Sequence, residues 1–325
     1  MAAILVGAGL PRSYARDCAE VLVAADARGF EGNGVMQLPA YLAHLQADEL
    51  AAGARIRRRT QGGLLIYDGG GALGHVVARR ALLDAARLAE RRGVVVGLTH
   101  SHGYTGVLGV HVREAARRGM LALYLQTTQP FLGLPGSGRR VIGNNPIAFA
   151  CPVPGQEPLV FDMSCSTSSL GRIRVAAIEG RPIPPDWAVD VEGRPTTDAA
   201  AAMLGALLPA AGHKGLGLAI LVECLAGALS ERERTPGQLS GFLLVVNPAL
   251  VSNPASFRAG MDQWLEVYEA GGPELRLPGR RAEALERERE RDGIPVPAPV
   301  LAQLEAAARQ LGVPFRLGSR PASGS

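Results

Sequence analysis

Two apolar segments and the long amphipathic helix between them constrain the fold of this chain more than any other feature. LLIYD at 64–68 and VVVGL at 94–98 are rich in branched side chains and predict strands. Between them, HVVARRALLDAARLAERRG at 75–93 repeats apolar residues at helical spacing and predicts a helix that ends at Gly93. A strand, a turn, a helix and a second strand in this order indicate a chain of the α/β class.

The rest of the chain continues to mix the two kinds of element. Apolar patterns predict further helices over 13–26, 38–45, 110–119, 198–208 and 214–230, and further strands over 120–127, 147–153, 158–164 and 242–246. The Arg-rich stretch 55–60 is predicted to be a loop, and the charged segment 282–292 a solvated helix. A length of 325 residues suits one large domain or two smaller ones.

The turn at 69–74 reads GGGALG and matches the G-x-G-x-x-G pattern of dinucleotide-binding turns. In such a turn the pyrophosphate binds free N–H groups at the start of the helix. The acidic residue expected about 20 positions further on, for the ribose, is missing, because the second strand continues into GLTHSH. Glycine-rich turns of this kind also occur for packing alone. The sequence therefore favours a packing turn over a Rossmann fingerprint.

Charge and composition limit the partners of the chain. The formal charge is +4 and the arginine clusters are spread along the sequence, while aromatic residues make up only 5%. Nucleic-acid-binding proteins usually gather basic residues on one face, with aromatic residues among them. We therefore expect no nucleic-acid partner, and an acidic or phosphate-bearing small molecule instead.

The cysteines and the apolar runs indicate a cytoplasmic protein. Cys18, Cys151, Cys165 and Cys224 have no CxxC spacing and lie in apolar segments, so we expect reduced core thiols and no metal site. No run approaches the roughly 20 apolar residues of a membrane span, and the first residues lack the basic region of a signal peptide. We expect no membrane partner.

Six segments carry a resemblance to a known family. They are DARGFEGNGVMQLPAY (26–41), VIGNNPIAFACPVP (141–154), PLVFDMSCSTSSLGRI (158–173), IPPDWAVDVEGRPTTDA (183–199), LLPAAGHKGLGLAILVECLAGALS (207–230) and LRLPGRRAE (275–283). In this order they resemble the type-2 malate/L-lactate dehydrogenase family, an NAD(P)-dependent group that includes sulfolactate, ureidoglycolate and piperideine-2-carboxylate enzymes. Each segment alone is a weak signal, but six in order over nearly the whole chain are a strong one.

The resemblance implies a fold and a domain arrangement. Family members bind the dinucleotide on a mostly antiparallel sheet flanked by helices, which is not a Rossmann fold. The implied NAD(P)-binding domain covers residues 66–254. Residues 1–65 with 255–325 form the implied second domain, which is helical and carries substrate and dimer contacts. We therefore expect a homodimer.

The resemblance also implies cofactor contacts. They are Thr105, Gly106, Leu108, Asn145, Asp162, Ser164, His213, Lys214, Arg280 and Arg281. Lys214 stands at a helix start between glycines, where a cation and free N–H groups suit a pyrophosphate. The two arginine forks suit a phosphate and favour NADP, with NAD possible. Simpler roles stay open: Lys214 as an exposed lysine, Asn145 as the cap of an Asn-Pro turn, and Asp162 with Ser164 as a strand end.

The chain departs from the family pattern where relatives hold the substrate. Relatives have a Ser-His pair there, in which the histidine is the proton donor, and an arginine four residues later that pairs with the substrate carboxylate. Here these positions are Gly32, Asn33 and Gln37. An amide does not exchange a proton near neutral pH, and a glutamine bonds a carboxylate without supplying charge.

Three more positions belong to the implied substrate pocket. Tyr41 keeps the family frame, whereas Asn144 replaces the usual threonine. Arg172 stands where relatives that act on 2-oxo acids often have lysine. Its permanent cation suits an acidic substrate and partly compensates for Gln37.

The segment THSHGYTG at 99–106 offers a replacement for the lost proton donor. Aligned without gaps, the histidine position of the family falls on Tyr104, and with a two-residue shift it falls on His102. A histidine is matched to neutral pH, whereas a tyrosine is a weak acid that needs a nearby cation. A third interpretation is that this loop only forms a wall of the nicotinamide site.

These observations predict an NAD(P)H-dependent reductase that transfers hydride to a C=O or C=N carbon. The altered pocket argues against malate and lactate, and favours a cyclic imine or an unusual 2-oxo compound. An iminium arrives already protonated and needs no strong acid. The alternative is a degenerate family member that binds nucleotide or another ligand without redox turnover.

Overall fold

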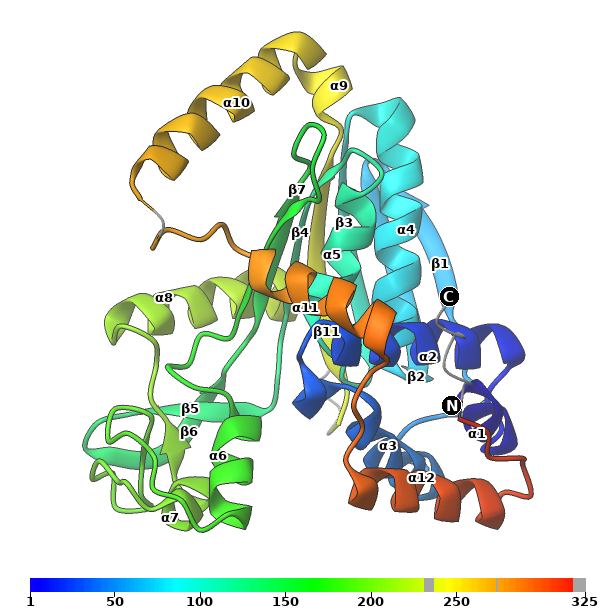
Figure 1. Ribbon diagram of the computed structural model, residues 1–325, viewed down its shortest axis with the longest axis vertical. Coiled ribbons are helices and arrows are strands. Elements are labelled where there is room, and N and C mark those ends of the chain that lie inside the picture. The colour runs from blue at the N-terminus through cyan, green and yellow to red at the C-terminus, as the bar shows by residue number, and fades with distance from the viewer. Residues whose placement is uncertain (231–236, 273, 318–325) are drawn as a thin grey trace.

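The computed structural model describes residues 1–230, 237–272 and 274–317. Its centre is a seven-stranded sheet with the strand order β1-β2-β3-β11-β4-β7-β8 (Figure 1). The strands are β1 (Arg57–Gln61), β2 (Leu64–Ala72), β3 (Val94–His102), β4 (Leu121–Gln126), β7 (Ile147–Cys151), β8 (Leu159–Met163) and β11 (Leu239–Val246). Only β2 and β3 pair in parallel, and the other five pairings are antiparallel. The predicted α/β class with a mostly antiparallel sheet is confirmed.

The predicted strand–turn–helix–strand unit lies at the β1 edge of this sheet, with β2 and β3 as adjacent strands (Figure 1). Helix α4 (Gly74–Arg92) connects β2 to β3 and buries a stripe of alanines and valines against the sheet. The glycines of the turn permit close approach: a Cβ on Gly74 would lie 2.0 Å from the carbonyl oxygen of Gly103, and a Cβ on Gly69 would lie 2.6 Å from that of Ser101. These contacts are with the protein's own backbone, as the packing interpretation requires.

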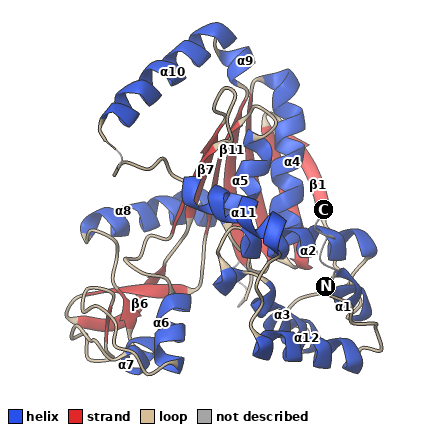
Figure 2. Ribbon diagram, in the orientation of Figure 1, coloured by secondary structure: helices blue, strands red, loops and turns tan. Residues whose placement is uncertain are grey.

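A second, four-stranded sheet lies apart from the first (Figure 2). Its order is β6 (Ser137–Gly143), β5 (Pro130–Leu134), β10 (Ala206–Leu207) and β9 (Ala188–Val189). Helices α6 (Leu170–Ile178) and α7 (Ala199–Leu204) pack on it around a core of Leu132, Ile173 and Leu207. Helix α8 (His213–Val222) follows, and it continues as a π-helical turn (Glu223–Gly227) and a 3-10 turn (Ala228–Ser230).

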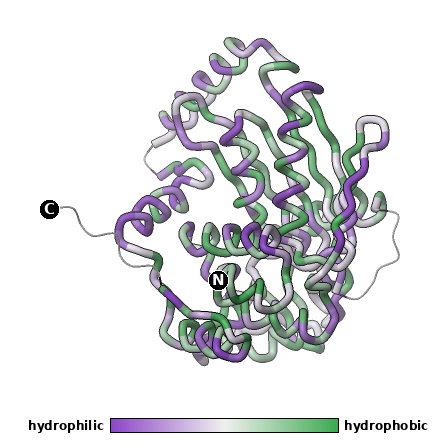
Figure 3. Tube along the Cα trace, turned by 90° about the vertical axis from the view of Figure 1, so that its right-hand side faces the viewer, coloured by the Kyte–Doolittle hydropathy of each residue, from purple (hydrophilic) through white to green (hydrophobic). Residues whose placement is uncertain are grey.

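The first helices and the last described helix pack together. Helices α1 (Ala2–Gly7), α2 (Arg12–Ala27), α3 (Leu38–Gln46) and α12 (Ala298–Gln310) share one apolar cluster. Two 3-10 turns, Glu31–Asn33 and Val35–Gln37, connect α2 to α3. Figure 3 shows hydrophobic and hydrophilic residues interspersed along the helices of the molecule, which is the pattern of helices with one buried face.

Helix α11 (Arg280–Asp292) ties this helical part to the sheet through ion pairs. Glu286 on α11 accepts from Arg28, which follows α2, and from Arg113 on α5 (Leu108–Ala116), each at 2.9 Å. The side chains of Arg28 and Arg113 are only 3% and 7% exposed. Because removing one partner of a buried ion pair leaves an uncompensated charge, this network fixes α2, α5 and α11 relative to one another.

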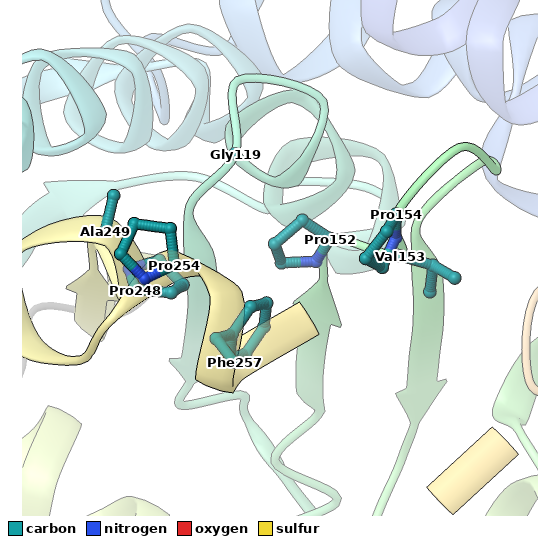
Figure 4. Close-up of a pocket in the computed structure, with 8 residues that line it drawn as sticks. All are labelled: Gly119, Pro152, Val153, Pro154, Pro248, Ala249, Pro254 and Phe257. Atoms are coloured by element: carbon teal, nitrogen blue, oxygen red, sulfur yellow. The ribbon is translucent and has the colours of Figure 1, made fainter. Parts of the chain in front are cut away.

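Helices α9 (Pro248–Val251) and α10 (Pro254–Ala270) project from the far end of the large sheet. A cavity of about 200 Å³ lies beneath them, lined by four prolines, Phe257 and other apolar groups (Figure 4). None of the residues predicted to bind cofactor or substrate lines it. This cavity therefore belongs to the packing of α9 and α10 rather than to the predicted site.

Several local predictions were wrong. The stretch predicted as a loop at 55–60 overlaps β1, which is an exposed strand at the edge of the sheet. It pairs with β2, whose residues are mostly buried. The helix predicted over 198–208 ends at Leu204, because residues 206 and 207 pair with β9 as strand β10. Gly205 permits this close approach, since a Cβ there would lie 1.9 Å from the carbonyl oxygen of Val189. Three cysteines are buried as expected, but Cys224 is exposed.

Two further findings concern metals and membranes. Within the described ranges, no group of three or more His, Cys, Asp or Glu side chains is placed to hold a metal ion. In the same part of the chain, one helical stretch, His213–Ser230, is apolar and long enough to cross a membrane by length and composition alone. A helix of a folded core passes the same test, so this stretch assigns no membrane span.

Candidate functional site

The Tyr104 loop, residues 103–107, connects β3 to α5 and brings two predicted catalytic positions together. The hydroxyl of Tyr104 donates to Oδ1 of Asn33 at 3.4 Å, across 71 residues of sequence. Tyr104 is half-buried and packs against the apolar cluster of the chain ends. Burial raises the pKa of its phenol, and the neighbouring carboxylate of Asp162 raises it further. Tyr104 is therefore protonated at neutral pH and is a weaker acid than a free tyrosine, because its charged neighbour is a carboxylate and not a cation.

His102, the other predicted donor, lies inside the protein with no exposed surface. Its Nδ1 is 2.8 Å from the carbonyl oxygen of Gly103, and its Nε2 is 2.8 Å from the hydroxyl of Thr99. Burial lowers the pKa of the ring to about 4, so the ring is neutral. Both ring nitrogens are committed to the protein, which is the arrangement of a structural core histidine.

The start of α5 holds the next group of predicted cofactor residues. Thr105 and Leu108 are buried, and the Thr105 hydroxyl bonds the side chain of Gln126. Asp162 at the end of β8 accepts from the backbone N–H of Gly109 at 2.7 Å. Burial raises the pKa of this carboxyl to about 6, and the bond from Gly109 opposes the shift. The structure thus brings Tyr104, Asp162 and the first turn of α5 to one place.

Asn145 connects three parts of the fold. Its Oδ1 accepts from the N–H of Thr128 at 2.9 Å, and its Nδ2 donates to the carbonyl oxygen of Ala219 at 3.0 Å and to Glu223 at 3.2 Å. The side chain is fully buried and the residue has a positive φ of 21°. Asn145 therefore fixes α8 against the strands rather than capping only its own turn.

Asn144 and Ser164 belong to the same neighbourhood. The Thr128 hydroxyl donates to Oδ1 of Asn144 at 2.9 Å, and the Asn144 carbonyl accepts from the N–H of Cys165 at 2.8 Å. The Ser164 hydroxyl lies 2.9 Å from that of Ser166. These polar groups lie just before β7 and just after β8, near the Asn145 side chain that contacts α8.

Helix α8 presents its first residues outward. Gly212, His213 and Lys214 are exposed, and Gly212 has a φ of 62° with open space where a Cβ would stand. The N–H groups of Lys214 and Gly215 already donate to backbone carbonyls. This helix start therefore offers an anion mainly the exposed cation of Lys214.

The remaining substrate residues are placed separately. Nε2 of Gln37 donates to the carbonyl oxygen of Gly32 at 2.6 Å, so this amide already has an internal partner. Tyr41 is buried, and its ring meets that of His75 edge-on at 5.0 Å. Arg172 is exposed on the first turn of α6, which Ser169 caps, and its guanidinium lies 5.8 Å from the ring of Trp187.

The two arginines predicted to bind phosphate differ. Arg280 donates to Glu283 at 2.7 Å and to the backbone of Glu157, so its charge is already paired. These three residues border a polar cavity of about 420 Å³. Arg281 is exposed on the first turn of α11.

Motif comparison missed the residues that hold the others in place. Thr128 and Glu223 both bind the Asn145 side chain, and Thr99 binds His102. Their partners lie between 3 and 78 residues away in the sequence. The π-helical turn that begins at Glu223 is a feature often found near functional sites, but no residue pattern announces it.

Known proteins match this geometry and sequence. The family described as malate/L-lactate dehydrogenase matches residues 1–305. The (2R)-3-sulfolactate dehydrogenase (NADP(+)) of Chromohalobacter salexigens is 35% identical over 94% of each chain. The Delta(1)-pyrroline-2-carboxylate reductase of Ancylobacter novellus is 30% identical over 93% of each chain.

A solved structure agrees with these relatives. The delta1-piperideine-2-carboxylate reductase of Pseudomonas syringae has a TM-score of 0.82 and 28% identity, covering 94% of this chain and 96% of that one. The matches cover nearly the whole chain, along which the six segments are distributed. The family predicted from those segments is confirmed: the chain belongs to the malate/L-lactate dehydrogenase family of oxidoreductases.

Proposed function

We propose that the chain is an NAD(P)H-dependent reductase that delivers hydride to a C=N or C=O carbon. A cyclic imine is the favoured substrate, and an unusual 2-oxo compound is the other. Malate and lactate are disfavoured. Two relatives support the imine: the Ancylobacter enzyme and the Pseudomonas enzyme are both named as reductases of cyclic imine carboxylates.

The contact between Tyr104 and Asn33 carries this proposal. The half-buried phenol of Tyr104 has a raised pKa and is a weak acid. An imine nitrogen is more basic than a carbonyl oxygen, so a weak acid suffices to protonate it. His102 is a poorer donor, because the protein occupies both of its ring nitrogens. We assign the donor role to Tyr104 and a positioning role to Asn33.

The substrate pocket supports the same conclusion. Gln37 bonds the carbonyl oxygen of Gly32 and carries no charge, so it does not replace the arginine clamp of relatives. The exposed Arg172, beside Trp187, is the cation that we propose for a single substrate carboxylate. One carboxylate fits a cyclic imine acid, whereas malate carries two.

The nicotinamide dinucleotide supplies the hydride when it is bound. We propose that His213 and Lys214 hold its pyrophosphate, and that Asp162, Ser164 and Asn145 line its path. Thr105, Gly106 and Leu108 add backbone and packing contacts there. Arg281 favours the extra phosphate of NADP, whereas Arg280 is already paired with Glu283. NADP is therefore the expected cofactor, with NAD possible.

The organisation of the molecule is part of the proposal. We infer that residues 66–254 bind the cofactor without a Rossmann turn, and that residues 1–65 with 255–325 form the helical domain for substrate and dimer contacts. The expected assembly is a cytoplasmic homodimer. Tight backbone contacts at Gly69 and Gly74 support a turn that serves packing instead of phosphate binding.

The test is NADPH oxidation against a panel of cyclic imine carboxylates, pyruvate and oxaloacetate, with calorimetry of NADPH and NADH binding. We expect binding, and oxidation that is fastest with a cyclic imine. Faster oxidation with oxaloacetate or pyruvate would contradict the substrate proposal. Binding without any oxidation would instead support the alternative, a degenerate family member without redox turnover. The loss of the Ser-His-Arg set at Gly32, Asn33 and Gln37 is the observation that motivates this alternative.

A further inference from the structure

The Asn33 turn, residues 31–37, is a short segment that other parts of the protein must hold in place. It consists of two 3-10 turns that meet at Gly34, and each has three residues. Within the turn, Nε2 of Gln37 donates to the carbonyl oxygen of Gly32 at 2.6 Å. Turns of this length are not stable alone, because ordering them costs more conformational entropy than their few hydrogen bonds return. The position of Asn33 therefore depends on contacts with other elements.

The contact between this turn and Tyr104 tolerates little displacement. The Tyr104 hydroxyl lies 3.4 Å from Oδ1 of Asn33. A side-chain contact of about 3.6 Å is no longer a hydrogen bond. A shift of the turn by a few tenths of an ångström would therefore separate the phenol from the amide.

The second half of the turn rests on α2. Oδ2 of Asp26, in the last turn of α2, accepts from the N–H of Val35 at 2.9 Å. Gly34 lies against the same carboxylate, since a Cβ there would lie 1.8 Å from Oδ1. These contacts fix residues 34 and 35. Asn33 belongs to the first half of the turn, which needs a support of its own.

Arg289 of α11 supports the first half. Its Nη1 donates to the main-chain carbonyl oxygen of Asp26, and its Nη2 donates to Oε1 of Glu31. Glu31 precedes Asn33 by two residues and is 258 residues away from Arg289 in the sequence. The planar guanidinium makes both bonds at once, so it fixes Glu31 relative to the end of α2. The Arg289 side chain is only 12% exposed.

Helix α11 is itself fixed where Arg289 leaves it. Leu285 packs onto the chain just after α2, because a Cβ on Gly29 would lie 2.5 Å from Cδ2 of Leu285. Glu286 accepts from Arg28 at 2.9 Å in the same place. Arg289 therefore extends to the turn from a helix that is already held against α2.

We propose that Arg289 is a positioning residue that holds Asn33 against Tyr104 through Glu31. This inference rests on the proposed reductase function. Arg289 touches neither substrate nor cofactor in this scheme. The Glu31 side chain is 45% exposed, and ion pairs with such a partner add little to the free energy of unfolding. Loss of the pair should therefore move the turn while the rest of the protein stays folded.

Steady-state kinetics test the role of the guanidinium. Arg289→Gln should lower kcat about tenfold and leave the KM for NADPH unchanged, because a catalytic contact is misplaced while the cofactor residues are untouched. Arg289→Lys keeps the charge without the two-pronged geometry, and its kcat should lie between those of the wild type and Arg289→Gln. Wild-type kcat in Arg289→Gln would overturn the proposal.

The matched control is Arg287→Gln. Arg287 lies on the same helix, but it pairs with Glu283 within that helix, and its side chain is 71% exposed. This variant removes an arginine from α11 without removing a contact to the Asn33 turn. It should keep the wild-type kcat, and a loss equal to that of Arg289→Gln would contradict the specific role of Arg289.

A double-mutant cycle separates positioning from a general structural effect. In a Tyr104→Phe background the contact with Asn33 is already absent, so Arg289→Gln should lower kcat no further. An equal loss in both backgrounds would show that Arg289 does not act through this contact, and it would overturn the proposal. Wild-type kcat in Tyr104→Phe alone would overturn it as well.

Crystallography tests the geometry without any turnover. In crystals of Arg289→Gln, the distance between the Tyr104 hydroxyl and Oδ1 of Asn33 should exceed about 3.6 Å, whereas the wild type should keep the contact. The bond from Val35 to Asp26 should persist in both proteins. An unmoved Asn33 in the variant would overturn the proposal.

The two proposals fail separately. If the wild type oxidises NADPH and Arg289→Gln matches it, the positioning role fails and the reductase function stands. If the wild type oxidises no substrate, the reductase function fails, and the two crystal structures still decide whether Arg289 holds Asn33 against Tyr104.

Discussion

Asp26 should make the free energy of unfolding decrease as the pH rises. Its carboxylate is buried beside the turn that carries Asn33. Its Oδ2 accepts from the N–H of Val35 at 2.9 Å, and a Cβ on Gly34 would lie 1.8 Å from its Oδ1. The side chain is 4% exposed. Burial raises the pKa of this carboxyl from 3.8 to about 6, and the Val35 bond and Arg289 only partly oppose the shift.

The sign follows from proton binding. Between the two pKa values the folded state binds more protons than the unfolded chain, so stability decreases as pH rises. The contribution is complete below pH 3.8 and lost above about pH 6. A shift of this size corresponds to about 3 kcal/mol in all, of which about 1.4 kcal/mol falls between pH 5 and pH 8.

The measurement is urea unfolding of the wild type and Asp26→Asn at intervals from pH 5 to pH 8. Asparagine keeps an oxygen for the Val35 N–H but does not titrate. Other groups, such as Asp162, affect both proteins equally, so the difference between the two free energies of unfolding isolates Asp26. We expect the wild type to lose about 1.4 kcal/mol relative to the variant over this range. A difference that stays constant with pH would refute the reasoning.

Three further predictions concern the site and its scaffold. Tyr104→Phe should lower kcat about 100-fold or more with little change in the KM for NADPH, and steady-state kinetics that show less than a threefold loss would remove Tyr104 as the donor. Gly74→Ala should lower the melting temperature strongly, because the new Cβ would clash with the backbone of Gly103. The control is Gly53→Ala, which should change the melting temperature little because nothing lies within 4 Å of its Cβ. Equal shifts of the melting temperature in the two variants would contradict the packing role of Gly74. Arg281→Ala should raise the KM for NADPH about tenfold but not that for NADH, whereas Arg280→Ala should mainly reduce stability, and the reverse outcome would reassign the phosphate contact.

The strong periodic elements were predictable from the sequence, because their apolar faces are local. The helix at 75–93 appears as α4 within one residue of its predicted limits, and β2 and β3 begin at their predicted residues but each run four residues further. The edge strand β1 was not predictable in this way. All five of its residues are exposed, so its extended form comes from pairing with β2 rather than from a pattern of its own.

The site was predictable as a set of segments but not as an arrangement. Motifs place Asn33 and Tyr104 in separate segments, and only the fold brings the phenol to the amide. Sequence alone also left His102 and Tyr104 as equal candidates. The two side chains differ in their surroundings. Hydrogen bonds to Thr99 and Gly103 occupy both ring nitrogens of His102, and the sequence of this segment does not show that the ring turns inward to make them.

The meeting of the two chain ends has a consequence for engineering. A Cβ on Gly7 would lie 2.9 Å from Cγ1 of Val313, and Val300 and Leu304 pack into the apolar cluster of the first helices. A linker should therefore join the segment after α12 to the start of α1, and new ends should be tolerated at the exposed turn of Gly62 and Gly63 between β1 and β2. Such a circular permutant would carry the last helices and the first helices as one continuous stretch of chain, still joined to α5 by the ion pairs of Glu286.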